Sequence, residues 1–158
     1  MIKVLFVCLG NICRSPMAEG VFLNKLKERG LTDRVLCDSA GTSAYHIGER
    51  PDDRACMTCS KNNIELNHRA RQLVEQDFSE FQYILAMDSS NYTNIQKLCK
   101  DGMSGCEIRK MREFDDVKDS IDVPDPYYGG ISGFDRVFEM LDRSCERFLD
   151  YLVEKHQL

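Results

Sequence analysis

The chain of 158 residues lacks a long apolar run. Its longest early apolar stretch, residues 4–9, is too short to cross a membrane and lies at the bottom of the range for a signal-peptide core. It also lacks an excess of basic residues, since the formal net charge is −5 and the sequence pI is about 5.2, which argues against nucleic acid as a partner. We find no internal repeat, low-complexity tract or linker. These absences predict a cytoplasmic protein with one domain, residues 1–158, that binds neither membrane nor nucleic acid.

Cysteine is plentiful, with eight residues, but the pattern of a zinc site is missing. Cys56 and Cys59 form a Cys-x-x-Cys pair, yet no second pair with matching spacing follows. Residues 52–62 have a helical pattern, so we interpret both cysteines as packing residues. The chain is also too long for a small scaffold held together by disulfides.

What is present is a cysteine at the end of a strand. Residues 2–7 are apolar and rich in β-branched side chains, as in a central strand buried on both faces, and Cys8 follows them. Ser15 is a good N-cap, Pro16 suits the first helical position, and helical apolar spacing continues to Gly30, a typical helix stop. This strand–loop–helix order places Cys8 where ligands bind in open parallel sheets.

The loop after Cys8 is suited to an oxyanion. The helix amino terminus, the loop amides and Arg14 favour a thiolate at Cys8. The same amides can surround a phosphate while Arg14 holds two of its oxygens as a planar fork, so no metal is required. Gly10 permits close backbone approach or a positive φ, and Asn11 tolerates the left-handed region. The alternative, that Cys8 is only a small apolar residue ending a strand, does not account for Arg14 and the helix start.

A second cysteine–arginine pair with the same spacing provides an internal control. Between Cys106 and Arg112 there is no glycine, and Glu113 follows the arginine in place of a serine. We expect this second pair to have no catalytic role.

Further along the chain, strands alternate with helices. We predict strands at residues 34–39, 81–88 and 107–114, and helices at 52–62, 91–100 and, from a long apolar stripe, 134–152. Residues 115–132 form a loop rich in proline and glycine. The alternation predicts an α/β fold, with a parallel sheet covered by helices on both faces and right-handed crossovers.

Two motifs resemble those of one known family. Residues 7–19 (VCLGNICRSPMAE) look like the phosphate-binding loop of the low-molecular-weight protein tyrosine phosphatases, and residues 125–128 (DPYY) resemble that family's general-acid motif. Shorter matches occur at residues 38–43, 68–72 and 86–88, so the resemblance covers essentially the whole chain. It implies a single phosphatase domain, built as a three-layer sandwich around a four-stranded parallel sheet of order 2-1-3-4.

The resemblance implies hydrolysis of phosphotyrosine in proteins, and of small aryl phosphates, without metal or cofactor. Cys8 attacks phosphorus to give a cysteinyl-phosphate, and Asp125 protonates the leaving phenolate and later activates water. The oxygens are held by Arg14 and the amides of Leu9, Gly10, Asn11, Ile12 and Cys13. This agrees with a loose transition state, which needs positioning and charge stabilisation, and with a phenoxide that leaves poorly unless it is protonated. Phosphate and vanadate are expected inhibitors, tyrosine-phosphorylated proteins the partners, and a monomer the functional state.

The resemblance also assigns supporting roles. Ser15 donates to the Cys8 thiolate, and Cys13 traps an oxidised Cys8 as a disulfide. The loop is held by Asn11, Ser39, His68 and Asp88, with Asp88 the first alternative to Asp125 as the acid. The phenol ring is flanked by Tyr45, His46, Tyr127 and Tyr128, for which ordinary partial burial is the alternative. Tyr127 and Tyr128 are also candidate phosphorylation sites, and His46 is a candidate for tuning substrate choice.

Three other functions stay open. A thioredoxin-linked arsenate reductase would use two resolving cysteines with the spacing of Cys99 and Cys106, but these lie well past the end of the third strand, where that family places the first of them. A protein-arginine phosphatase would carry threonine in place of Ile12, and an apolar Ile12 favours an aryl phosphate. A non-catalytic phosphate-binding module would need neither a thiol nor a remote acid.

Overall fold

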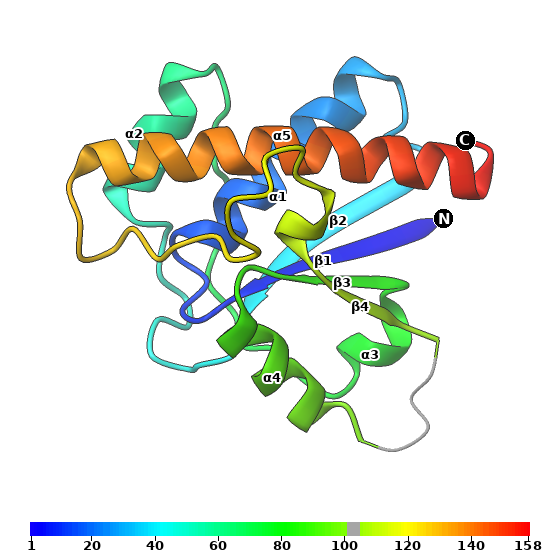
Figure 1. Ribbon diagram of the computed structural model, residues 1–158. Coiled ribbons are helices and arrows are strands. Elements are labelled where there is room, and N and C mark those ends of the chain that lie inside the picture. Colours follow the sequence, from blue (N-terminus) through cyan, green and yellow to red (C-terminus); the bar gives the residue numbers. More distant parts are fainter. Residues whose placement is uncertain (101–104) are drawn as a thin grey trace.

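The computed structural model describes residues 1–100 and 105–158 (Figure 1). Four parallel strands form one sheet in the order β2-β1-β3-β4, namely β1 (Ile2–Cys8), β2 (Val35–Gly41), β3 (Tyr83–Ala86) and β4 (Glu107–Lys110). The helices α1 (Arg14–Glu28), α2 (Asp53–Lys61) and α5 (Ile131–His156) lie on one face, and α3 (Asp77–Glu80) and α4 (Ser89–Leu98) on the other. The predicted three layers and strand order 2-1-3-4 are confirmed.

The central strand β1 contributes to both hydrophobic cores. Val4 and Phe6 pack under α1 and α5, where the Phe6 ring centroid lies 5.4 Å from that of Phe22. Leu5 and Val7 point to the opposite core, which includes residues of α3 and α4. Because alternate side chains enter opposite cores, the strand is apolar without interruption. Its burial fixes the position of Cys8 at its carboxyl end.

Helix α1 begins two residues earlier than predicted. Its first residue is Arg14, Cys13 occupies the N-cap without a side-chain cap hydrogen bond, and Ser15 therefore lies inside the first turn. The N-cap role predicted for Ser15 is wrong, because its hydroxyl is bonded to groups of the loop instead. Pro16 is tolerated because the first turn leaves its N–H groups without intrahelical partners. The predicted stop is confirmed: Gly30 has φ +66°, just after the C-cap.

Other boundaries differ where long-range contacts decide them. The strand predicted at 107–114 ends at Lys110, and a 3₁₀ helix, η1 (Met111–Phe114), replaces its second half. The strand predicted at 81–88 is shorter, because Asp88 leaves the sheet and caps α4 with a 2.7 Å bond from the Asn91 N–H. The one-turn helix α3 was not predicted, and α5 extends beyond both ends of its apolar stripe.

Buried Arg112 explains why the fourth strand ends early. Its guanidinium pairs with Asp115 at 3.0 Å and Asp119 at 2.7 Å, and it also donates to two carbonyl groups of the following loop. Arg143 of α5 holds Asp115 from the other side, at 2.9 Å. The control pair Cys106 and Arg112 thus contains a structural arginine, which anchors the loop that leads to Asp125.

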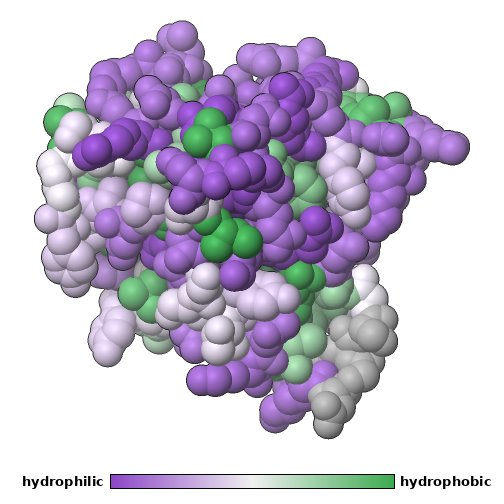
Figure 2. Space-filling view, viewed as in Figure 1, coloured by the Kyte–Doolittle hydropathy of each residue, from purple (hydrophilic) through white to green (hydrophobic). Residues whose placement is uncertain are grey.

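The face seen in Figure 2 is mostly polar, with apolar side chains scattered over it. Within the described residues, no helix combines the length and apolar character needed to span a membrane.

Candidate active site

One pocket, of about 280 Å³, gathers predicted site residues from three distant segments. The loop between β1 and α1 forms its floor, the segment after β2 one wall, and the loop before α5 the other. Its lining residues are Cys8, Leu9, Gly10, Ile12, Cys13, Arg14, Ser43, Tyr45, His46, Asp125, Tyr127 and Tyr128.

The loop presents its amide groups because its carbonyl groups are used elsewhere. Three carbonyls accept backbone hydrogen bonds of 2.8–2.9 Å from other segments: those of Cys8, Leu9 and Ile12, from the N–H groups of Thr42, Ser43 and Asp52 respectively. A peptide unit whose C=O points outward directs the following N–H inward. The loop is therefore built to bind an anion.

Cys8 is almost fully buried, and its sulfur lies 3.0 Å from the Ser15 hydroxyl oxygen. The Ser15 oxygen in turn accepts a 2.8 Å hydrogen bond from the Asn11 amide. This leaves the hydroxyl proton free to donate, and the carbonyl of Ala40, the other acceptor, is more distant at 3.4 Å. The arrangement favours a hydrogen bond from Ser15 to a thiolate at Cys8.

Arg14 is held by acidic partners on one side. Its Nη1 donates to Asp88 at 2.6 Å and to the Val123 carbonyl at 3.0 Å, while Nη2 lies 3.7 Å from the Asp125 carboxylate. Burial acts to lower the pKa of Arg14, but the negative charges at Cys8, Asp88 and Asp125 raise it overall. Among the described residues only Nη1 has hydrogen-bond acceptors, so the other edge of the guanidinium is available to a ligand.

Asp125 lies at the pocket mouth with its side chain 37% exposed. One carboxylate oxygen accepts a 3.0 Å hydrogen bond from the Tyr127 N–H, which fixes the turn at the following proline. The other faces Arg14. The carboxyl group can therefore reach a leaving group that enters between the tyrosines.

Asn11 supports the loop from behind. It has φ +58° and is 1% exposed, and its amide donates to Ser15 and to Ser39 at 3.0 Å. Its carbonyl oxygen accepts from His68 Nε2 at 2.7 Å and from the Arg71 N–H at 3.0 Å. The structure thus brings Asn11, Ser15, Ser39 and His68 together, with the side chains of Asn11 and Ser15 behind the loop and not on the pocket wall.

The two glycines at the loop make room for close contacts. The left-handed residue is Asn11, whereas a Cβ at Gly10 would lie 2.9 Å from the His46 ring and would have to displace that side chain. Sequence reasoning missed Gly41, where a Cβ would lie 2.7 Å from the Leu9 carbonyl oxygen. A glycine that ends a strand is a signal for such backbone contact. Ser43 of the pocket wall was also missed as a site residue, although it ends the family match at residues 38–43.

The wall residues differ in exposure. Tyr127 is 40% exposed and its ring contacts Tyr128 edge-on, while Tyr45 and Tyr128 are largely exposed. His46 is oriented by a 2.8 Å contact between its Nδ1 and Glu49. Cys99 and Cys106 pack against the core on the α4 side. Neither cysteine belongs to the described residues that line the pocket.

A sequence profile described as low molecular weight phosphotyrosine protein phosphatase matches residues 3–158. The protein of that name from Schizosaccharomyces pombe is 47% identical over 149 residues, which are 94% of this chain and 95% of that protein. The solved structure of a protein tyrosine phosphatase from Entamoeba histolytica, with Hepes in its active site, is similar to this chain with a TM-score of 0.93 and a sequence identity of 40%. The match covers 100% of each chain. A solved drosophila arginine phosphatase has a TM-score of 0.90 at 35% identity, with 95% of this chain and 97% of that chain covered.

The fold and the pocket define an α/β protein whose strand–loop–helix unit presents a thiol, a guanidinium and free amides to an oxyanion. The chain belongs to the low molecular weight phosphotyrosine protein phosphatase family, as its loop and acid motifs indicated.

Proposed function

We propose that this protein hydrolyses phosphotyrosine in proteins, and small aryl phosphates, through a cysteinyl-phosphate intermediate. One observation carries the proposal: Cys8, Arg14 and Asp125, from opposite ends of the chain, line the same pocket. A nucleophile, an oxyanion clamp and an acid are the parts that phosphoryl transfer needs.

In the first step, the Cys8 thiolate attacks phosphorus and a sulfur–phosphorus bond forms as the phosphorus–oxygen bond to the phenol breaks. Arg14 and the loop amides hold the three non-bridging oxygens. Asp125 gives its proton to the departing oxygen, so that a neutral phenol leaves.

In the second step, the Asp125 carboxylate accepts a proton from water as the water oxygen attacks phosphorus. The sulfur–phosphorus bond breaks, inorganic phosphate forms, and Cys8 leaves as a thiolate that accepts the Ser15 hydrogen bond. Charge is supplied by the guanidinium and amides, so neither metal nor cofactor takes part.

An aryl substrate is supported by the walls of the pocket. Tyr127 and Tyr128 on one side and Tyr45 on the other can flank a phenol ring. The apolar Ile12 in the loop gives no polar partner to a guanidinium leaving group, which disfavours phosphoarginine despite the likeness to an arginine phosphatase. We therefore propose tyrosine-phosphorylated proteins as partners, with phosphate and vanadate as inhibitors.

The eight cysteines are all free thiols. Because the mechanism needs a reduced Cys8, we propose that the protein acts in the reducing cytoplasm as a monomeric single domain, residues 1–158.

A comparison of substrates tests the proposal. The purified, reduced protein, with a metal chelator present, should release phosphate from a phosphotyrosine peptide much faster than from matched phosphoserine and phosphoarginine peptides. It should not turn over arsenate with thioredoxin and thioredoxin reductase. Preference for phosphoarginine or arsenate would establish one of the alternative enzymes, and binding without turnover would establish a phosphate-binding module.

A further inference from the structure

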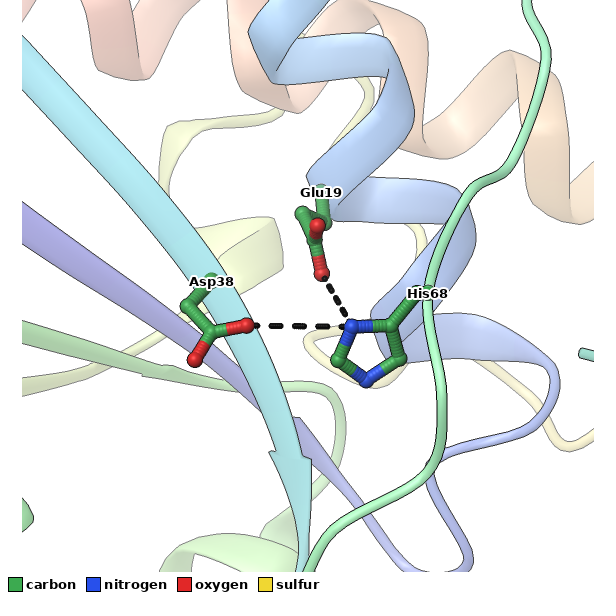
Figure 3. Close-up of side chains that lie close together, drawn as sticks. All are labelled: Glu19, Asp38 and His68. Carbon is green, nitrogen blue, oxygen red and sulfur yellow. Dashed lines mark ion pairs between the residues drawn. The ribbon is translucent and has the colours of Figure 1, made fainter. Parts of the chain in front are cut away.

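A second cluster of chemically active side chains lies behind the phosphate loop. Glu19 extends from α1, Asp38 from β2 and His68 from the segment after α2, and all three converge (Figure 3). The Nδ1 atom of His68 lies 3.2 Å from a Glu19 oxygen and 3.7 Å from an Asp38 oxygen.

These separations suit one metal ion. Nitrogen and oxygen ligands about 2.0–2.2 Å from a tetrahedral zinc ion lie about 3.3–3.6 Å from each other. The three ligand atoms here all lie within 4.8 Å of one another, so only small side-chain movements are needed. The side chain of Asp38 is 39% exposed, so an ion can reach the cluster from solvent and a water molecule can occupy its fourth coordination position.

The hydrogen bonds around His68 direct a lone pair toward the carboxylates. Its Nε2 contacts the Asn11 oxygen at 2.7 Å, and that atom is an oxygen because it also accepts the Arg71 N–H. An oxygen accepts, so Nε2 carries hydrogen. In neutral imidazole Nδ1 then has a lone pair that points at the carboxylates of Glu19 and Asp38. Because the lone pair and the carboxylate oxygens repel one another, the arrangement needs a positive charge between the ring and the carboxylates.

The two carboxylates are also oriented by neighbours. Glu19 accepts a 2.6 Å hydrogen bond from the Ser39 hydroxyl, and Arg71 binds the second oxygen of Asp38 at 3.1 Å, leaving the first free. Metal ligands in proteins are held by such an outer set of hydrogen bonds, with histidine donating through its other nitrogen.

We propose that Glu19, Asp38 and His68 bind a divalent cation of the zinc type, with water in the fourth position. The ion replaces any proton on Nδ1 and keeps hydrogen on Nε2, where it is donated to Asn11. It thereby stabilises the network that supports the phosphate loop, and it takes no part in the chemistry at Cys8.

Cobalt(II) is a suitable probe, because its visible absorption reports both tetrahedral geometry and thiolate ligands. Titrated into the metal-free, reduced protein, it should give the bands of a tetrahedral nitrogen–oxygen site without thiolate charge transfer, and zinc should displace it. Glu19→Gln and Asp38→Asn should each weaken binding about tenfold or more. The matched control Glu65→Gln removes an exposed charge from the segment that carries His68 and should leave binding unchanged.

Nitrogen-15 spectra of the wild-type histidines give a test that does not depend on variants. On zinc addition, the His68 Nδ1 resonance should move to a metal-bound position while Nε2 stays protonated. Binding that shows thiolate bands, that survives both substitutions, or that leaves His68 unshifted would place the metal elsewhere and overturn the proposal.

Discussion

Two cysteines, Cys8 and Cys13, lie in the phosphate loop, and their different surroundings give their thiols different reactivities. Burial, reinforced by negative charge at Asp52 and Cys8, raises the pKa of Cys13 well above its usual range. Cys13 therefore remains a thiol at neutral pH. Cys8 instead has the Ser15 hydroxyl 3.0 Å from its sulfur, a hydrogen-bond partner suited to the nucleophile that we propose.

Cys8→Ser should reduce turnover to background while phosphate and vanadate still bind, because the amides and Arg14 remain. Arg14→Lys should slow turnover by about 10²–10³-fold, since a single ammonium cannot replace the planar fork. Steady-state kinetics and calorimetric vanadate binding measure both. Cys106→Ser, in the control pair, should keep wild-type kinetics. Substantial activity in Cys8→Ser would remove the nucleophile assignment.

Asp125→Ala should slow phosphotyrosine cleavage by about 10²–10⁴-fold, the usual contribution of a general acid. The loss should shrink for aryl phosphates whose phenols are strongly acidic, because such leaving groups need no proton. A plot of rate against leaving-group pKa, for wild type and variant, measures the convergence. An equal loss for every leaving group would mean that Asp125 is structural and make Asp88 the next candidate.

Mild peroxide should inactivate the enzyme reversibly through a Cys8–Cys13 disulfide, because the neighbouring thiol can condense with a sulfenic acid before further oxidation. Cys13→Ser should make the inactivation harder to reverse with dithiothreitol. Peptide mapping by mass spectrometry identifies the bond. Finding Cys8 joined to a different cysteine, or to none, would contradict this prediction.

At the scale of elements, local signals predicted most helices and strands, and long-range contacts explain the differences. The helix start at Asp52 and the helix stop at Gly30 depend on contacts within a turn of the chain, so a helix from residue 52 and a stop at Gly30 could be predicted from the sequence. The break after β4 depends on Arg112 pairing with Asp119 across a loop, and no local pattern encodes that pairing. Ser15 has the composition of a cap, but Cys8 and Asn11 engage its hydroxyl.

The loop before the acid should depend on Asp115. Burial acts to raise the pKa of Asp115, but hydrogen bonds from Arg143, the Val117 N–H and Arg112 lower it below its usual value. Asp115→Asn should destabilise the fold by about 3–5 kcal/mol at pH 7, because it removes the buried carboxylate that pairs with Arg112 and leaves this buried cation with the exposed Asp119. Urea unfolding measures this loss.

The same pKa shift sets the pH range of the effect. A carboxyl group whose folded pKa is lowered stabilises the fold above its unfolded pKa, about 3.9, and this contribution is lost as pH falls from there toward the folded value. The difference between wild type and Asp115→Asn should therefore shrink below about pH 4. Asp116→Asn, which removes an exposed ion pair with Arg147, should cost about 1 kcal/mol or less. Equal losses in the two variants would contradict the anchoring role.

At the scale of the whole molecule, the pocket combines one contiguous loop, which the sequence shows directly, with wall residues that only folding brings beside it. The Cys8 loop is contiguous, so its spacing and its strand–helix setting could be recognised directly. Its walls come from residues 43–46 and 125–128, which the crossovers bring beside it. The contact of Ser43 with the pocket follows from that proximity and was not predicted, whereas the position of Gly41 at a strand end was a signal that could have been used.

The protein should sediment as a monomer of 18.2 kDa. On the face seen in Figure 2 the apolar side chains are scattered, whereas a stable self-association needs a contiguous patch. Analytical ultracentrifugation across a range of concentrations provides the measurement. A mass that doubles with concentration would contradict it.

The contact between Arg14 and Asp125 has a consequence for the catalytic cycle. Before substrate arrives, the guanidinium already has a tethered carboxylate 3.7 Å away, as well as Asp88. In the proposed mechanism, substrate entry is therefore an ion exchange: an incoming dianion takes the place of the carboxylate at Arg14, and Asp125 takes up a proton before it serves as the acid. When phosphate departs and Asp125 releases the proton that it took from water, its carboxylate can return from within the molecule at a high effective concentration. In the proposed cycle, Asp125 thus also acts as a resident competitor that helps to expel the product.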